Sequence, residues 1–262
     1  MGQSELIYDI PSYVIAVSVF CLMVLAGMVA RGWGKRVQLN TDAEAVAQAS
    51  AVQGSLLGLL ALLLGFTFSL SLSRFDERSV AVVHEANTMG TAYLRSDLIS
   101  EKRRDAAKGL LRQYGDARLA AVEISAADHV ARAQMVQRAA VVFDVLWQIA
   151  ADEAREFPTP VSMGFAASLN DMIDALSTRN SAIDRHVPEL VLFLLFGTFV
   201  VLGAVIGFSS AISGVRPGVP VYAMTLLIAV LVFLIIDLDR PRRGLIAVDQ
   251  SPLAAAVGAM QR

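Results

Sequence analysis

The sequence has a single cysteine, Cys21, among its 262 residues, so no disulfide can form within the chain. It also has no excess of charge of either sign, because 22 Lys and Arg stand against 24 Asp and Glu. Domains that bind nucleic acid usually carry a basic patch or a recognisable binding motif, and the sequence has neither. The composition therefore excludes a disulfide-stapled scaffold and predicts no nucleic-acid partner.

Sequence motifs of catalysis are missing as well. The pair His84-Glu85 is followed by Ala86, Asn87 and Thr88, so the HExxH zinc motif is not completed. No glycine-rich phosphate loop precedes a lysine, and no nucleophile has a base at a characteristic spacing. We therefore expect no enzyme, no metal site and no cofactor. An active site assembled from acids far apart in the sequence is the alternative that the motifs leave open.

Charge is absent from four long apolar runs, which are the most informative feature of the chain. The runs cover residues 13–30, 55–73, 190–213 and 219–236. At a rise of 1.5 Å per residue, each can cross the hydrocarbon core of a bilayer as a helix. A mean hydropathy of +0.57 agrees with a chain that is partly embedded in lipid. We predict a multi-pass protein of a cell inner membrane or plasma membrane, with the lipid bilayer as a partner, rather than a soluble protein with four buried helices.

The first run reads as a retained helix rather than a signal peptide, because Glu5 and Asp9 precede it without any Lys or Arg. Four crossings would place both termini and the long segment between the second and third runs on one side of the membrane. The loops 31–54 and 214–218 would lie on the other side. The distribution of Lys and Arg near the membrane ends favours, weakly, a cytoplasmic position for the long segment.

That long segment, residues 74–187, carries 14 basic and 16 acidic side chains. Its apolar residues recur at intervals of three and four, which is the helical pattern, and no stretch alternates as a strand would. Thr159-Pro160 predicts a helix start, with the helix running towards Arg185, and another helix is expected over 128–154.

The predicted fold is all-α: an integral membrane protein with four transmembrane helices and a helical soluble domain inserted between the second and third. The predicted parts are 1–73, 74–187, 188–237 and a C-terminal tail, 238–262. Between Gly58 and Asp97 there is no proline and, after Gly65, only Gly90. The second run is therefore expected to continue without a break into the soluble domain.

Small residues follow one side of the second run at spacings of three and four. Gly54 and Gly58 form a GxxxG pair, and Gly203 and Gly207 repeat that spacing in the third run. One interpretation is close helix packing, which small residues permit in lipid. The other is a pore, because hydroxyls and phenylalanine edges can line a passage for anions without a fixed charge. The candidate pore-lining residues are Gly58, Gly65, Phe66, Phe68, Ser69 and Ser73.

Charged residues gather where the second and fourth runs end. They either pair with one another across the mouth of the helix bundle or form a vestibule that concentrates anions. Three further polar residues, Glu85, Asn87 and Arg95, lie on the expected continuation of the second helix, where they could satisfy one another or neighbouring subunits. The juxtamembrane and vestibule candidates are Arg74, Arg78, Glu85, Asn87, Arg95, Asp237, Asp239 and Arg240.

Three motifs carry a resemblance to a known family. They are GLLALLLGFTFSLSLSRFDER at 58–78, EANTMGTAYLR at 85–95 and LDRPRRGLI at 238–246. Together they resemble the bacterial bestrophin-like membrane family, which is described as a domain of unknown function. The family name implies a distant similarity to bestrophins, which are pentameric anion channels with four membrane helices per subunit and a helical cytoplasmic domain.

The resemblance implies a homo-oligomer, a pentamer if the bestrophin plan holds, with the second helix lining the pore and small anions as partners. The chain lacks the Ile-Pro-Phe neck sequence of bestrophins, and no dense acidic run after the fourth helix resembles their calcium clasp. Calcium gating is therefore not implied. Two function classes stay open: an ion channel, with anions as the expected ions, and a non-conducting scaffold or sensor whose soluble domain binds a partner.

Overall fold

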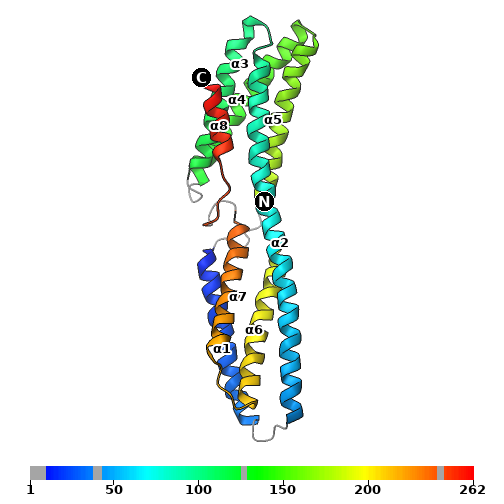
Figure 1. The fold of residues 1–262 in the computed structure, drawn as a ribbon. Coiled ribbons are helices and arrows are strands. Elements are labelled where there is room, and N and C mark those ends of the chain that lie inside the picture. The colour runs from blue at the N-terminus through cyan, green and yellow to red at the C-terminus, as the bar shows by residue number, and fades with distance from the viewer. Residues whose placement is uncertain (1–9, 38–42, 125–128, 241–244) are drawn as a thin grey trace. The chain divides into compact units, whose positions relative to one another are not determined.

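The chain is described by a computed structural model, which covers residues 10–37, 43–124, 129–240 and 245–262 (Figure 1). Within these residues the secondary structure is helical, without a strand. The helices are α1 (Ser12–Val37), α2 (Ala43–Ser96), α3 (Glu101–Glu123), α4 (His129–Glu156), α5 (Pro160–Asp184), α6 (Glu189–Ile212), α7 (Val219–Leu238) and α8 (Ser251–Met260). The all-α prediction is confirmed.

Four helical stretches are long and apolar enough to cross a membrane. The four apolar runs of the sequence fall in α1, α2, α6 and α7. Helix α2 is continuous over 54 residues, so the predicted continuation of the second run beyond the apolar segment is confirmed. At 1.5 Å per residue this helix is about 80 Å long.

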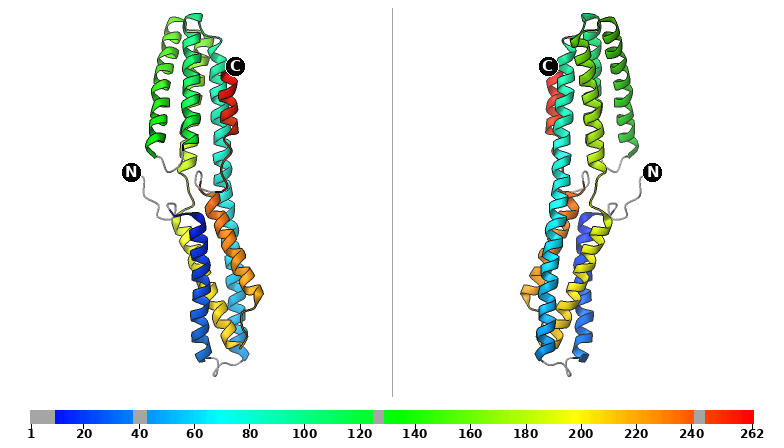
Figure 2. Two further views of the ribbon diagram at one scale, coloured as in Figure 1. Left: turned by 90° about the vertical axis from the view of Figure 1, so that its left-hand side faces the viewer. Right: turned by 90° about the vertical axis from the view of Figure 1, so that its right-hand side faces the viewer.

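The chain divides into two compact units. The first consists of Met1–Phe75 and His186–Ala247, and the second of Asp76–Arg185 and Val248–Arg262. The first unit holds α1, α6, α7 and the N-terminal part of α2, which run alongside one another in both views of Figure 2. The second unit holds the C-terminal part of α2 together with α3, α4, α5 and α8. The soluble character of the second unit stays a prediction.

Local sequence signals explain several helix ends. Thr159 caps α5 as predicted: its side chain accepts a hydrogen bond from the Ser162 amide, and the Ser162 side chain accepts one from the Thr159 amide. Pro160 at the first helical position needs no amide partner. Between α6 and α7, Gly214 has a φ of 69°, a left-handed conformation that glycine adopts without strain.

One expectation about a connecting segment is wrong. The loop expected over 31–54 is much shorter, because α1 continues to Val37 and α2 already begins at Ala43. Residues 43–53 are rich in alanine, glutamine and other strong helix formers, which extend α2 before its apolar run begins. The C-terminal tail contains a helix that was not expected, α8, which buries Leu253, Val257 and Met260 along one face.

The core of the first unit is formed by apolar side chains of all four of its helices. Its fully buried members include Phe199 and Leu202 of α6 and Val232 of α7, and Leu60 of α2 is 2% exposed. Burying a side chain of this size stabilises the structure by about 1.5–3 kcal/mol in water. In a bilayer, lipid tails are as apolar as the core, so burial of apolar side chains adds little. Close packing between the helices then stabilises the unit.

Candidate functional site

One face of α2 within the first unit is open. A Cβ atom built on Gly54, Gly58 or Gly65 would meet nothing within 4 Å. Ser69 and Ser73 on the following turns are exposed. On a helix of 3.6 residues per turn, Gly58, Gly65 and Ser69 fall within about 40° of one another. They therefore point in one direction, which we call the open face of α2 and which no other helix of this unit covers in the described structure. The exposed side chains of Leu62 and Leu72 border this face, each within about 40° of Gly58.

The two phenylalanines of the candidate set lie differently. Phe66 is 67% exposed, whereas Phe68 is partly buried and packs against the core of the first unit. Residues two apart on a helix point about 160° away from each other. The structure therefore places Phe66 beside the open face and Phe68 towards the interior of the unit.

The hydroxyls of Thr67 and Ser71, near the end of this run, face inward as well. The Thr67 hydroxyl donates to the Leu63 carbonyl oxygen at 2.5 Å, within its own helix. Ser71 is fully buried. Of the hydroxyls that crowd the end of the apolar run, only Ser69 and Ser73 reach the surface of the chain.

The second GxxxG pair is covered by α1. A Cβ on Gly207 would lie 2.0 Å from the Gly27 carbonyl oxygen, and one on Gly203 would lie 2.4 Å from the Met23 carbonyl oxygen. No side chain fits at either distance, so α1 and α6 approach each other backbone to backbone. For Gly203 and Gly207, the packing interpretation of GxxxG is confirmed.

Three of the juxtamembrane candidates are buried in the first unit and bond to backbone groups. Asp239 accepts a hydrogen bond from the Val187 amide at 2.8 Å, just before α6 begins. Asp237 accepts one from the Ile246 amide at 2.8 Å, and Arg240 donates to the Ile10 carbonyl oxygen. These side chains tie the C-terminal end of α7 to neighbouring segments of the chain.

Arg78, in the second unit, closes the end of α5. Its side chain is 2% exposed and donates to the carbonyl oxygens of Ala182 at 3.1 Å and Arg185 at 2.6 Å. The last carbonyls of a helix have no partner within that helix and carry partial negative charge. The arginine supplies both the hydrogen bonds and the positive charge.

Glu85 is the centre of a buried ionic network in the second unit. Its side chain is fully buried, and Oε1 accepts a hydrogen bond from Arg118 Nε of α3 at 2.7 Å. Oε2 accepts one from Arg179 of α5, and Arg179 Nη2 donates to Gln250 Oε1 at 2.7 Å. One carboxylate therefore holds two arginines, and the group has a net charge of +1.

The charge of Glu85 depends on these partners. Burial alone raises the pKa of a carboxyl, but the two arginines outweigh burial and hold the pKa of Glu85 below its ordinary value. Glu85 lies outside the four apolar runs. Glu85 is therefore ionised at neutral pH and joins three helices of the second unit. Beside the network, burial raises the pKa of Tyr114 to about 12.

The remaining candidates are not gathered into one site. Arg95 donates to the Gly164 carbonyl oxygen at 2.8 Å, Asn87 is exposed on α2, and Arg74 is partly buried. Among the residues that the structure describes, no group of three or more His, Cys, Asp or Glu could hold a metal ion.

Sequence reasoning missed Arg118 and Arg179 as the partners of Glu85. A signal for them was present, because Glu85 shares its face of α2 with Ala81, Val82 and Met89, all of which are buried. A carboxylate within an apolar helical stripe must be paired when the stripe is buried. The pattern does not show which arginines pair with Glu85.

The described fold is that of an all-helical protein with four helices long and apolar enough to span a membrane. Residues 13–253 match the family model described as the bestrophin-like domain. The chain therefore belongs to the bestrophin-like family, and the resemblance noted in the sequence is confirmed. No curated protein matches the chain.

Solved structures share the fold at low sequence identity. A crystal structure of a variant bacterial bestrophin homologue from Klebsiella pneumoniae superposes with a TM-score of 0.65 at 17% identity, over 95% of this chain and 97% of that chain. A second variant of a Klebsiella pneumoniae homologue gives 0.63 at 17% identity, over 94% and 96% of the two chains. A structure described only as a membrane protein variant gives 0.61 at 17% identity, over 95% and 96%. At this identity the likeness concerns the fold alone.

Proposed function

We propose that this chain assembles into a homo-oligomeric ion channel in which the open face of α2 lines the pore. The observation that carries the proposal is the absence of any neighbour within 4 Å of a Cβ at Gly54, Gly58 or Gly65. Gly203 and Gly207 show that the same spacing, when it serves packing inside this chain, brings a partner backbone into contact. We therefore propose that the open face contacts further copies of the chain.

Family membership supports a channel rather than an enzyme, since bestrophins are anion channels that assemble as pentamers. A pentamer of this chain would place five copies of the open face around one axis. The sequence favours an inner or plasma membrane and a cytoplasmic second unit.

Anions are the proposed ions because the open face offers hydroxyls and backbone dipoles without acidic side chains. No Asp or Glu occurs between Glu44 and Asp76, so a cation crossing along this face would meet no compensating charge. Ser69 and Ser73 are the proposed hydroxyl donors, with Phe66 beside them. Arg74 follows Ser73 but is partly buried and points about 140° away from Ser69 on the helix, so we do not place it on the open face.

Arg78 and Glu85 are buried and bonded within the second unit, so we propose that they hold the shape of a vestibule wall formed by that unit. Asp237, Asp239 and Arg240 are buried in the first unit, and we propose for them a structural role at the end of α7. Asn87 is exposed on α2 and is the proposed polar contact of the vestibule with ions.

The direct test is bilayer recording of the purified protein in asymmetric chloride, with the particle mass measured on the same preparation. A reversal potential near that of chloride from a defined oligomer is the expected result. An intact oligomer that stays silent across voltage and pH would contradict conduction.

A non-conducting scaffold or sensor is the second candidate. Leu62 is 55% exposed and Leu72 is 40% exposed, and both lie close to the direction of Gly58 on the helix. Large apolar side chains on that face would fill an axis rather than line a water-filled one. A silent oligomer with a leucine-filled axis would favour this function, with the second unit as the partner-binding part.

A further inference from the structure

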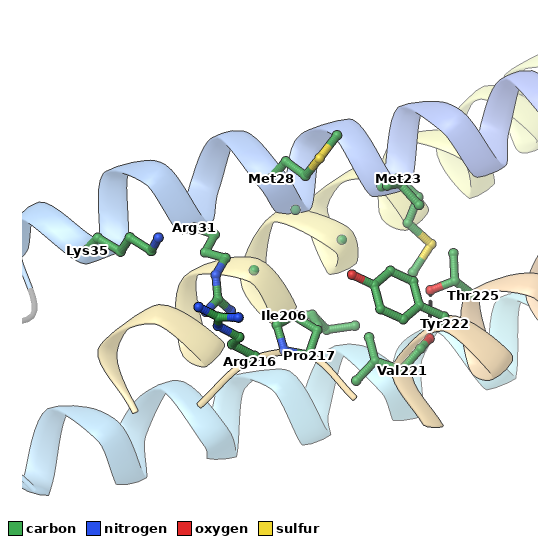
Figure 3. Close-up of a pocket in the computed structure, with 14 residues that line it drawn as sticks. Met23, Met28, Arg31, Lys35, Ile206, Arg216, Pro217, Val221, Tyr222 and Thr225 are labelled. Carbon is green, nitrogen blue, oxygen red and sulfur yellow. Dashed lines mark hydrogen bonds between the residues drawn. The ribbon is translucent and has the colours of Figure 1, made fainter. Parts of the chain in front are cut away.

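A cavity of about 330 Å³ lies inside the first unit, between α1, α6 and α7 (Figure 3). Its described lining residues include none from α2, so it is separate from the open face. Its volume is near the lower end of the range of about 300–1,000 Å³ that is usual for small-molecule sites. The cavity combines a basic end with an apolar end, and neither end has a part in the proposed channel.

The basic end is formed by Arg31, Lys35 and Arg216. Arg31 and Lys35 are one turn apart on α1, and Arg216 comes from the connection between α6 and α7. Arg31 Nη1 donates to the Val215 carbonyl oxygen at 3.1 Å, which fixes its side chain at this connection. Figure 3 shows the guanidinium groups of Arg31 and Arg216 pointing towards one another.

None of the described residues that line the cavity is acidic. Two guanidinium groups that face each other repel, and a bound anion placed between them removes the repulsion. Guanidinium forks match phosphate oxygens in geometry and form short, charge-assisted hydrogen bonds with them. The basic end is therefore suited to a phosphate group.

The apolar end reaches deeper along α1. Met23 precedes Arg31 by eight residues, which is about 12 Å along the helix. Met23 and Ile206 line this part, and Gly27, Gly203 and Gly207 add backbone walls without side chains.

Tyr222 lines the cavity between the two ends, and its hydroxyl points to the side of Arg31 and Arg216 in Figure 3. A ligand that fills the cavity needs both an anionic head and an apolar part.

We propose that this cavity binds an anionic phospholipid, with its phosphate between Arg31 and Arg216 and the first part of one acyl chain against Met23 and Ile206. The connection between α6 and α7 joins two apolar runs, so the basic end lies where a membrane surface would be and the apolar end points into the bilayer. Basic pockets between transmembrane helices bind lipid headgroups on the cytoplasmic side of membranes. In the proposed orientation this connection lies on the other side, where the same pairing of guanidinium and phosphate groups can form. A free phosphate ion would use the basic end and leave the apolar end empty.

The test is native mass spectrometry of the full-length protein after delipidation in a neutral detergent. Phosphatidylglycerol, phosphatidylcholine and inorganic phosphate serve as probes. We expect phosphatidylglycerol to bind more tightly than phosphatidylcholine, and inorganic phosphate at the same concentration not to displace it. Equal binding of the two lipids would overturn the anionic requirement. Complete displacement by inorganic phosphate would show a site for free anions instead.

Charge variants locate the site. Arg216→Gln should weaken phosphatidylglycerol binding about fivefold or more, because one basic residue near a membrane surface contributes roughly that factor. Arg36→Gln is the matched control, because Arg36 is exposed on the same end of α1 and is not among the residues that line the cavity. An equal loss in both variants would show general surface attraction and overturn the site.

A filling variant tests the apolar end. Val24 lines the cavity, so Val24→Trp should remove phosphatidylglycerol binding and leave the weak binding of inorganic phosphate unchanged. Unchanged lipid binding in this variant would overturn the placement of the acyl chain. Since the readout is binding and not current, a failure here is distinguishable from a failure of the channel proposal.

Discussion

The GxxxG pairs of α2 and α6 have the same spacing and opposite surroundings. On α6, a Cβ at Gly207 would lie 2.0 Å from the Gly27 carbonyl oxygen. On α2, a Cβ at Gly54 or Gly58 would meet nothing within 4 Å. The motif therefore indicates a surface that permits close approach, and only the structure shows whether the approach occurs inside the subunit. The same division applies to polar residues: Glu85 has partners within the subunit, and Ser69 lies on the open face.

This comparison separates two kinds of variant. A substitution at an interior contact should destabilise the subunit itself. A substitution on the open face of α2 should leave the subunit folded and change assembly or conduction.

The largest effect is expected from Glu85→Gln. The substitution leaves Arg118 and Arg179 buried without their carboxylate, and breaking a buried pair in this way costs about 3–5 kcal/mol. Thermal unfolding in detergent measures the loss. The control is Glu77→Gln, because the Glu77 ion pair with Arg185 is exposed and 3.9 Å long and is expected to contribute less than about 1 kcal/mol. Equal losses from the two variants would contradict the interior role of Glu85.

The same network predicts a dependence on pH. The pKa of Glu85 in the folded chain is lowered from its ordinary value of 4.5, so its contribution is fully present above that pH. The contribution is lost as the pH falls through the lowered pKa. The E85Q variant should therefore lose less stability than the wild type on acidification below pH 4.5.

Gly207→Ala is expected to have the next largest effect. The added methyl group meets backbone atoms of Gly27, which cannot move aside as a side chain can. Overpacking of this kind costs about 1–3 kcal/mol, and more where backbone must shift. Folded yield and melting temperature in detergent measure it. The control is Gly197→Ala on the same helix, where a Cβ meets nothing within 4 Å; equal destabilisation of the two variants would refute the close α1–α6 contact.

Gly65→Leu tests the other side of the comparison. The subunit has room for the side chain, so helix content should be unchanged, while the oligomer or its current should be lost. Particle mass and bilayer current report these two outcomes. The control is Gly197→Leu, which should retain both. A Gly65→Leu variant with wild-type mass and current would place the open face of α2 away from any subunit contact or pore.

The smallest effect is expected from Ser69→Ala, which removes one hydroxyl from the open face. The ratio of anion permeabilities should change by up to about fivefold, the equivalent of one hydrogen bond. Reversal potentials under mixed-anion conditions measure the ratio. Ser71→Ala is the control, because Ser71 is fully buried and should not affect selectivity. Unchanged selectivity in a conducting Ser69→Ala variant would remove Ser69 from the proposed filter.

Much of the fold could be predicted from the sequence. The apolar runs locate four helices because a bilayer requires uncharged stretches of nearly fixed length. The capping signal at Thr159 locates the start of α5 because few residue pairs satisfy a helix N-terminus so directly. Helix α8 was missed because its ten residues are too few for a clear periodic signal. The start of α2 was missed because alanine and glutamine favour a helix without marking a membrane run.

The candidate site was less predictable. Sequence spacing grouped Phe66 with Phe68, and helix geometry together with burial separates them. The juxtamembrane charges near the second and fourth runs looked alike in the sequence, yet Arg78 binds the carbonyls at the end of α5 and Asp239 binds an amide before α6. Such partners lie between 52 and 107 residues away along the chain, beyond the reach of local patterns.

The central claim is that the open face of α2 faces a water-filled axis. The most direct measurement is thiol labelling in lipid nanodiscs, after Cys21→Ser removes the exposed native cysteine. Ser69→Cys should react with a charged, water-soluble thiol reagent. Leu227→Cys, at an exposed position of α7 that should face lipid, should not react. A Ser69→Cys variant as unreactive as Leu227→Cys would contradict the claim.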